Sequence, residues 1–334
     1  MNFQEMNKSI LSACALFVWG AASVRAQQPV LRFGSDKTFK IAQFTDMHLD
    51  PSKPRRLAEA EKTFARLDRI LATERPDLVV FTGDVVTGAP AEDMWRRLLD
   101  TMTARRVPFC VVLGNHDSEQ DLSRQQIGRI VTSYPGSLNA LDAAGELADR
   151  ELEILGSGLR RPAWLLYCLD SHSESLLEGI DGYDWFRPEQ VAWLRDRCTA
   201  RRTANGGRAV PSLAFFHIVL PEYLAAWRNP SNTHIGRAAE AECPGALNTG
   251  MFAAMIETGS VAGTFVVAEK GVCLGYGRFS GDNTPSNNLR PGVRLLLLTE
   301  GERGFETWIR EDDGRMVDHA RFAEGKITEI AVER

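Results

Sequence analysis

Short apolar runs alternate with longer amphipathic segments along the first three quarters of this chain. The runs are rich in β-forming residues and too short for helices, so they predict buried strands over residues 39–44, 78–81, 107–113, 164–169 and 213–216. In other segments apolar residues recur at helical spacing, which predicts helices over residues 55–74, 93–106, 188–202 and 250–257. This alternation predicts an α/β fold in which helices cover the outer faces of the sheets.

The pattern changes after residue 261. Turns rich in glycine, asparagine and aspartate separate apolar runs over residues 261–267, 271–276, 293–298 and 305–309. These runs predict a second, mostly antiparallel sheet that packs on the first. No internal repeat, low-complexity tract or linker-like segment interrupts the chain, so residues 37–325 are expected to form one domain.

The first 26 residues have the pattern of a secretory signal peptide. Lys8 supplies a positive charge, residues 10–22 form an apolar run, and Val24-Arg25-Ala26 places small residues at the cleavage positions. The run is short for a bilayer span, and an uncleaved anchor or a buried helix is the alternative interpretation. We expect a periplasmic or secreted protein with no stable membrane insertion after cleavage.

Composition and charge narrow the classes of function. The 334 residues are 44% hydrophobic and 25% charged, as in ordinary globular domains, and the net charge of -5 argues against a nucleic-acid partner. Cys14 lies in the predicted signal peptide, and no two cysteines have Cys-x-x-Cys spacing. A zinc-thiolate site or a redox dithiol is therefore not expected.

Residue types that bind metals follow the predicted strands. Asp46 and His48 follow the first strand, Asp84 the second, Asn115 the third and His217 the fifth. Carboxylate, imidazole and amide groups gathered at the carboxyl ends of strands are suitable ligands for zinc, iron or manganese. The carboxylate of Asp84 could bridge two cations, which would clamp a phosphate and activate a water for in-line attack.

Two further polar residues come directly after Asn115. The imidazole of His116 could protonate the leaving oxygen of a phosphate ester, because it adjoins a predicted metal ligand. We expect His116 to act as the catalytic acid, with the carboxylate of Asp117 orienting its ring.

Taken together, these motifs resemble those of the calcineurin-like metallophosphoesterases. The family's order is matched by Asp46-Met47-His48, Gly83-Asp84, Gly114-Asn115-His116-Asp117 and His217, over most of the chain. The resemblance implies a four-layer α-β-β-α sandwich of two packed mixed sheets. It also implies two divalent metal ions, Mn, Fe or Zn, one held by Asp46, His48 and Asp84 and the other by Asp84, Asn115 and His217. The expected substrate is a small-molecule phosphate mono- or diester.

Three shorter stretches resemble a secreted bacterial subgroup related to purple-acid-phosphatase-like proteins. They are Gly83-Asp84-Val85-Val86-Thr87-Gly88, Gly275-Tyr276-Gly277-Arg278 and Thr307-Trp308-Ile309-Arg310. Thr87 stands where purple acid phosphatases have an iron-binding tyrosine, so a purple iron centre is not expected. We interpret Arg278 as one half of an ion pair rather than as a substrate contact. Asp170-Ser171-His172 is interpreted as a loop beside the site rather than as a serine nucleophile.

The chain departs from the family at one motif. The family's Gly-His-x-His, which gives one histidine to each metal, is missing, because no histidine occurs between His234 and His319. Three interpretations stay open: a weakened but real phosphoesterase, an inactive protein that binds a phosphorylated ligand, or rescue by a substitute ligand. Glu269 is the first candidate for a substitute and His234 the second.

Overall fold

The structure, a computed structural model, describes residues 28–158, 161–237, 239, 241, 243–259, 263–269, 272–285 and 288–331, with 263–269 given as backbone only. The predicted signal peptide, residues 1–26, lies outside these ranges. Within them, no helix combines the length and the hydropathy that crossing a bilayer requires.

The larger sheet consists of seven strands: Thr38–Phe44 (β2), Leu78–Thr82 (β3), Phe109–Val112 (β4), Gly292–Thr299 (β10), Phe305–Glu311 (β11), Met316–Ala323 (β12) and Lys326–Glu329 (β13). Their order is β13-β12-β11-β10-β2-β3-β4. β2, β3 and β4 run parallel to one another, whereas the other neighbours are antiparallel. The three parallel strands therefore direct their carboxyl ends to the same edge of the sheet.

The smaller sheet consists of Leu31–Arg32 (β1), Arg150–Leu155 (β5), Pro162–Cys168 (β6) and Ser212–Phe215 (β7). Their order is β1-β5-β6-β7, and β6 runs parallel to β7. A separate two-stranded ladder pairs Gly263–Glu269 (β8) with Val272–Gly275 (β9). The carboxyl end of β7 leads directly to His217, which places this residue on a different sheet from the other predicted ligands.

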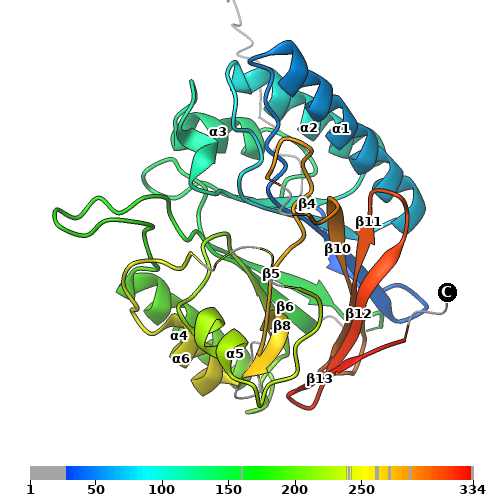
Figure 1. The fold of residues 1–334 in the computed structure, drawn as a ribbon. Helices are drawn as coiled ribbons and strands as arrows, with labels where there is room; N and C mark the ends of the chain where they lie inside the picture. The colour runs from blue at the N-terminus through cyan, green and yellow to red at the C-terminus, as the bar shows by residue number, and fades with distance from the viewer. Residues whose placement is uncertain are drawn as a thin grey trace, which may run out of the picture.

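Helices cover the outer faces of both sheets. They span Pro54–Glu74 (α1), Ala91–Arg105 (α2), Arg124–Thr132 (α3), Pro188–Ala204 (α4), Glu222–Arg228 (α5) and Met251–Thr258 (α6), with one 3₁₀ turn at His116–Ser118 (η1). Figure 1 shows α1, α2 and α3 on one side of the molecule and α4, α5 and α6 on the other, with the sheets between them.

Alternation of side chains along the strands produces three apolar layers. In β2, Phe44 packs with the buried residues of α1 and α2, whereas Ile41 packs with those of β5, β6 and β7. In β6, Leu166 faces the larger sheet, whereas Tyr167 packs with the helices on the far side. Each sheet is thus covered on one face by helices and on the other by its partner sheet. The predicted α/β fold and four-layer sandwich are confirmed.

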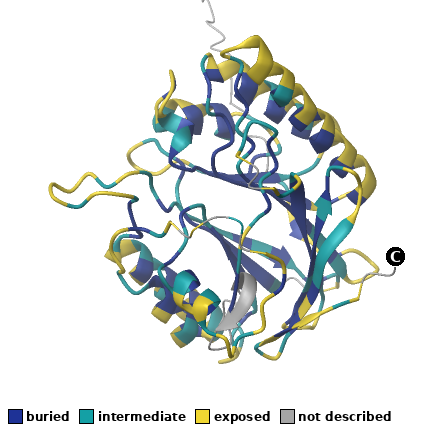
Figure 2. Cartoon of the chain, in the orientation of Figure 1, coloured by how far each residue is buried: buried dark blue, intermediate teal, exposed yellow. Residues whose placement is uncertain are grey.

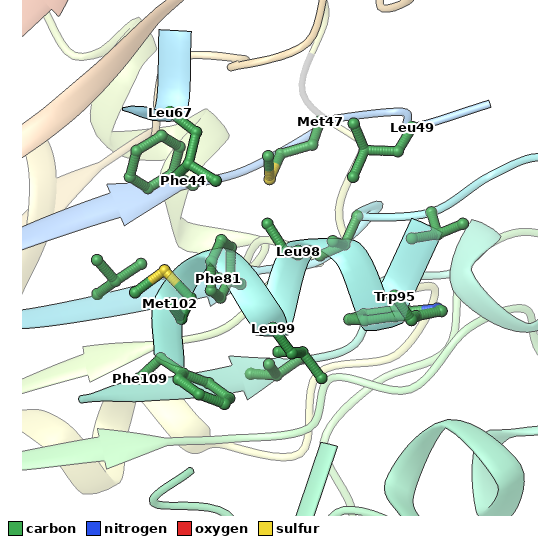
Figure 3. Packing of buried hydrophobic residues seen from close by; sticks show 14 of the residues in the cluster. Phe44, Met47, Leu49, Leu67, Phe81, Trp95, Leu98, Leu99, Met102 and Phe109 are labelled. Carbon is green, nitrogen blue, oxygen red and sulfur yellow. The ribbon is translucent and has the colours of Figure 1, made fainter. Parts of the chain in front are cut away.

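Burial follows these layers. Figure 2 shows buried residues along the strands and exposed residues along the outward faces of the helices. In Figure 3, Trp95 and Leu99 of α2 point toward the sheet that carries Phe81 and Phe109. All four side chains are buried. Burial of an aliphatic or aromatic side chain of this kind stabilises the fold by about 1.5–3 kcal/mol, so this layer holds α2 against the strands that carry the site.

The predicted place of the C-terminal strands is wrong. We expected a second sheet after residue 261, but β10 pairs with β2 and thereby extends the first sheet, with Leu296 opposite Ile41. The reason is that β10 is buried on both faces, which a strand in the middle of a covered sheet requires. The second sheet is instead built around β6 and β7, together with β5, which the sequence pattern did not reveal.

Candidate metal centre

The ends of the three parallel strands meet at one edge because their register is aligned. Phe44 lies opposite Phe81, and Thr82 lies opposite Val112. The segments that follow these pairs carry the predicted ligands Asp46, Asp84 and Asn115, and they leave the sheet side by side. Adjacent parallel strands thus gather residues that are far apart in the sequence.

All five predicted ligands converge around Asp84. Its Oδ2 lies 3.5 Å from Nε2 of His48, and its Oδ1 lies 3.5 Å from Nε2 of His217. The Nε2 of His48 also lies 4.0 Å from Oδ1 of Asp46. The Oδ1 of Asn115 lies 3.2 Å from Nε2 of His217. Among the described residues, Asp46, Asp84 and His217 each present a ligand atom within 4.8 Å of the other two.

Three of these residues have left-handed backbone conformations. The φ angles of Asp46, His48 and Asp84 are 49°, 43° and 51°. Such angles are uncommon outside glycine, although Asp and His adopt them more readily than most residues. Backbone hydrogen bonds hold them: the N–H of Asp46 donates to the carbonyl of Gly83, and that of His48 donates to the carbonyl of Asp84, both at 3.0 Å. Strain that the surroundings maintain in this way is typical of binding and catalytic sites.

Glycine is required where the loops come closest. Gly83 has a φ of 86°, and a Cβ there would overlap the imidazole of His217 and lie 2.8 Å from Cα of Gly114. At Gly114, a Cβ would overlap Oδ1 of Asp84 and lie 2.5 Å from its backbone nitrogen. The two glycines therefore allow the His217 ring and the Asp84 carboxylate to approach each other.

The structure corrects the expected role of Asp117. Its carboxylate is fully buried and accepts four backbone N–H groups, from Asp84, Val85, Val86 and Gly114, at 2.8–3.1 Å. Those bonds engage both oxygens, so the carboxylate does not orient His116; it joins the loops after β3 and β4. Burial and the neighbouring Asp84 raise the pKa of Asp117 to about 6, against the effect of its N–H donors.

Glu119 contacts His116 instead. Its Oε2 lies 2.6 Å from Nδ1 of the imidazole. The other ring nitrogen, Nε2, lies 4.0 Å from Oδ2 of Asp84. Burial would lower the pKa of His116, but the hydrogen bond to Glu119 and the charge of Asp84 raise it above the usual value. The side chain of His116 is 41% exposed and is therefore accessible to a ligand.

A loop from the far end of the chain fixes the segment that carries Asp46 and His48. The hydroxyl of Thr284 donates to the carbonyl of Asp46 at 2.7 Å, and Nδ2 of Asn283 donates to the carbonyl of His48 at 3.1 Å. Gly281 lies so close that a Cβ would overlap the carbonyl of Met47. In the sequence this stretch has only the composition of a turn, so no local signal reveals its contact with the site.

The donor set around His217 fits a cation. Its Nδ1–H donates to the carbonyl of Thr82 at 2.9 Å, which leaves Nε2 facing the oxygens of Asn115 and Asp84. A ring nitrogen between two acceptor oxygens requires a positive charge, from a proton or from a metal. Burial would lower the pKa of His217, but Asp84 and Asp46 raise it to about 10, which shows the same demand for positive charge.

Asp84 and Asn115 match this requirement. Burial would raise the pKa of Asp84, but His217 and His48 hold it well below its usual range, so the carboxylate is ionised as a bridging ligand must be. Within the described part of the chain, Nδ2 of Asn115 is buried without a hydrogen-bond partner. Its Oδ1 faces the cluster, 3.2 Å from Nε2 of His217. The residues present suit a cation on either side of Asp84.

The secondary candidates make other contacts. The hydroxyl of Ser171 accepts the N–H of Ile218 at 2.8 Å, while Nε2 of His172 contacts Oε1 of Gln190 at 3.0 Å, so the two residues form no catalytic dyad. Arg278 is buried and pairs with Glu311 at 3.0 Å, as an ion-pair partner should.

Of the two candidate substitute ligands, only His234 has a described side chain, and it does not join the centre. His234 is exposed, and its ring packs against Trp227 with centroids 4.7 Å apart. It is absent from the group formed by Asp46, Asp84 and His217. The side chain of Glu269 lies outside the described part of the chain.

Comparison with known proteins agrees with this geometry. Residues 39–242, more than half of the chain, match the family described as Calcineurin-like phosphoesterase. The chain is 32% identical to "Probable inactive purple acid phosphatase 29" of Arabidopsis thaliana, over 86% of each protein. It is 30% identical to "Probable inactive purple acid phosphatase 14" of the same plant, over 70% of this chain and 66% of the relative. It is also 32% identical to "Phosphatase DCR2" of Saccharomyces cerevisiae, over 59% of this chain and 37% of that protein. The chain belongs to the calcineurin-like phosphoesterase family.

Proposed function

We propose that this chain hydrolyses small phosphate mono- or diesters with the help of two divalent cations, Mn, Fe or Zn. The observation that supports the proposal best is the convergence of four ligand-type side chains, those of Asp46, His48, Asn115 and His217, around the buried carboxylate of Asp84. Isolated pairs of Asp and His are common on protein surfaces. A shared carboxylate at the joined ends of two sheets is typical of a two-metal hydrolase.

The proposed ligands divide into two sets that share Asp84. Asp46 and His48 complete one set, and Asn115 and His217 complete the other. When bound, the cations would polarise the phosphate oxygens and lower the pKa of a water molecule. The carboxylate of Asp117 holds the shared ligand Asp84 beside Asn115, because it joins the two loops that carry them.

His116 is the proposed catalytic acid. It is partly exposed, and its Nε2 faces the cluster at 4.0 Å from Asp84. An ester bound against the cluster would therefore bring its leaving oxygen within reach of this nitrogen, where a proton can be donated as the P–O bond breaks. A raised pKa keeps more of the ring protonated near neutral pH, which suits this role.

A second candidate function is binding of a phosphorylated ligand without turnover. It is favoured by the absence of any histidine between His234 and His319, which leaves three protein ligands for each cation. Two of the relatives also carry the word "inactive" in their names. Three protein ligands are nevertheless compatible with an open catalytic site, because water can occupy the remaining positions.

Metal content and turnover together separate the two functions. The purified protein is loaded with Mn²⁺, dialysed and analysed for metal, and the hydrolysis of 4-nitrophenyl phosphate is measured. We expect about two cations per chain and a rate that falls at least 100-fold in Asp84→Asn. Asp313→Asn, which changes a carboxylate at an exposed turn, should leave both quantities unchanged. Equal rates for wild type and Asp84→Asn would overturn the enzymatic proposal, and retained phosphate binding would then favour the second function.

We also infer that residues 1–26 direct export. The support is the charged, apolar and small-residue order of that segment. Expression of the full chain followed by N-terminal sequencing of the exported product tests this. A product that begins at or near Gln27 is expected, whereas full-length protein retained in the cell would contradict it.

A further inference from the structure

The turn after β4 places two charged side chains on the same side. His116 and Ser118 bound the 3₁₀ turn η1, and the N–H of Glu119 donates to the carbonyl of His116 at 3.3 Å. In a turn of three residues, side chains at positions i and i+3 are eclipsed. This brings Oε2 of Glu119 to 2.6 Å from Nδ1 of His116, a distance typical of a charge-assisted hydrogen bond.

This contact determines which ring nitrogen faces the cluster. With Nδ1 held by Glu119, Nε2 points toward Asp84 at 4.0 Å. Rotation of the ring would break the contact with Glu119 and turn a carbon toward the cluster. The adjacent carboxylate cannot substitute, because both oxygens of Asp117 already accept backbone N–H groups.

We propose that Glu119 is the positioning residue of His116: it holds the ring through Nδ1, so that Nε2 can donate a proton to the leaving oxygen of the substrate. The proposal rests on the hydrolytic function proposed above. In the reaction, water adds to phosphorus and the bond to the leaving oxygen breaks. That oxygen takes the proton from Nε2, and the proton lost by the attacking water restores the imidazolium. Glu119 keeps its hydrogen bond to Nδ1 throughout and touches no reacting atom.

The first test compares leaving groups. A phenolate leaving group needs protonation more than 4-nitrophenolate does, so loss of a positioned acid should slow phenyl phosphate more. In Glu119→Ala we expect kcat for phenyl phosphate to fall about 10-fold or more, with a clearly smaller fall for 4-nitrophenyl phosphate. KM and the bound metal should stay unchanged. Glu119→Gln, which retains an acceptor oxygen, should recover part of the loss.

Glu92→Gln is the matched control, because Glu92 is a similarly exposed carboxylate that pairs with Arg96 on α2. It should leave both substrates unaffected. Equal losses for the two esters in Glu119→Ala, or a change in metal content, would assign Glu119 a structural role and overturn the proposal.

The second test does not depend on turnover. In ¹⁵N-histidine-labelled protein, the proton on Nδ1 of His116 should give a downfield, slowly exchanging signal that is identified by its absence in His116→Ala. Glu119→Ala should abolish this signal. If the signal behaves so in a protein that hydrolyses nothing, the hydrolytic function fails while the positioning contact stands. If wild type is active and the signal survives in Glu119→Ala, the positioning proposal fails while the function stands.

Discussion

The two sides of the centre are built differently. On the side of the larger sheet, two residues that are not proposed as metal ligands hold the loops: the carboxylate of Asp117 accepts the N–H of Asp84, and the hydroxyl of Thr284 donates to the carbonyl of Asp46. On the side of the smaller sheet, His217 is the one predicted ligand, and a bond from its own ring to the carbonyl of Thr82 orients it. On the first side, residues that are not proposed ligands thus hold the ligand-bearing loops in place. On the second side, His217 is oriented by its own hydrogen bond.

This difference separates the ligand-type side chains from the residues that support them. No histidine occurs between His234 and His319, whereas the left-handed conformation at Asp84 is supported by the buried carboxylate of Asp117. The arrangement around Asp84 therefore does not need a full ligand set to form. Substitutions in the support should affect folding most, and substitutions in ligands should affect metal content most.

The largest effect is expected where the two sides touch. In Gly83→Ala the new Cβ would overlap the His217 ring, come within 2.8 Å of Gly114 Cα, and require a φ of 86°. We expect the free energy of unfolding to fall by about 4 kcal/mol or more, measured by urea denaturation. Gly145→Ala is the control: its φ is 82°, but its nearest neighbour is 3.9 Å away. Only the conformational cost of about 1–2 kcal/mol should appear there. Equal losses of unfolding free energy in the two variants would show that the two sides are not in tight contact at Gly83.

The next largest effect is expected at Asp117. In Asp117→Asn an amide replaces a carboxylate that accepts four backbone N–H groups, so one N–H₂ must face donors in a buried site. We expect a loss of about 3 kcal/mol in urea denaturation at pH 7.5.

The same change at Asp121 provides the control. Asp121 is exposed and accepts a single described N–H, that of Ala91, at 3.0 Å. Asp121→Asn should lose about 1 kcal/mol or less. Should Asp117→Asn be as mild as this control, the carboxylate would not be the support that holds the first side of the centre.

Sequence alone predicted which residues come together on the first side, because this depends on local rules. Asp46, Asp84 and Asn115 each follow a short apolar run, and parallel neighbours bring such ends together regardless of detail. The sheet that the C-terminal strands join was not predictable in the same way. The pairing of β10 with β2 links residues 294–299 to 38–43, and nothing in either pattern specifies which sheet will receive a strand buried on both faces.

The residues missed at the site share one cause. Glu119 could be matched to His116 only once the 3₁₀ turn was known, since an extended path would direct it elsewhere. Thr284 contacts a residue 238 positions away. The adjacency of His116 and Asp117 in sequence suggested a pair, but successive side chains diverge, and Asp117 turns into the core. The order of residues along the chain therefore predicts which residues reach the site. It does not predict which of their side chains contact one another.

A smaller effect is expected at the loop that supports Asp46. Thr284→Val removes the hydroxyl that donates to the Asp46 carbonyl at 2.7 Å while keeping nearly the same shape. We expect a loss of about 1 kcal/mol in unfolding free energy and weaker binding of one of the two cations, measured by titration calorimetry. Thr73→Val removes a hydroxyl that donates to a carbonyl on an exposed helix and should change neither cation site. Equal weakening of both cations in Thr284→Val would mean that this loop supports the whole centre rather than one side.

We expect substitution of His234 to leave the metal content unchanged. This outcome would sharpen the contrast between the two sides. His234 packs against Trp227 on the exposed surface, so His234→Ala should leave the Mn²⁺ content unchanged, whereas His217→Ala should lose about one cation per chain. Glu269→Ala completes the set and should lower the metal content only if Glu269 replaces a missing histidine. Elemental analysis after dialysis measures all three. A lower content in His234→Ala would show that a residue remote from the cluster in this structure reaches the centre when metal binds, and the second side would then have two ligands instead of one.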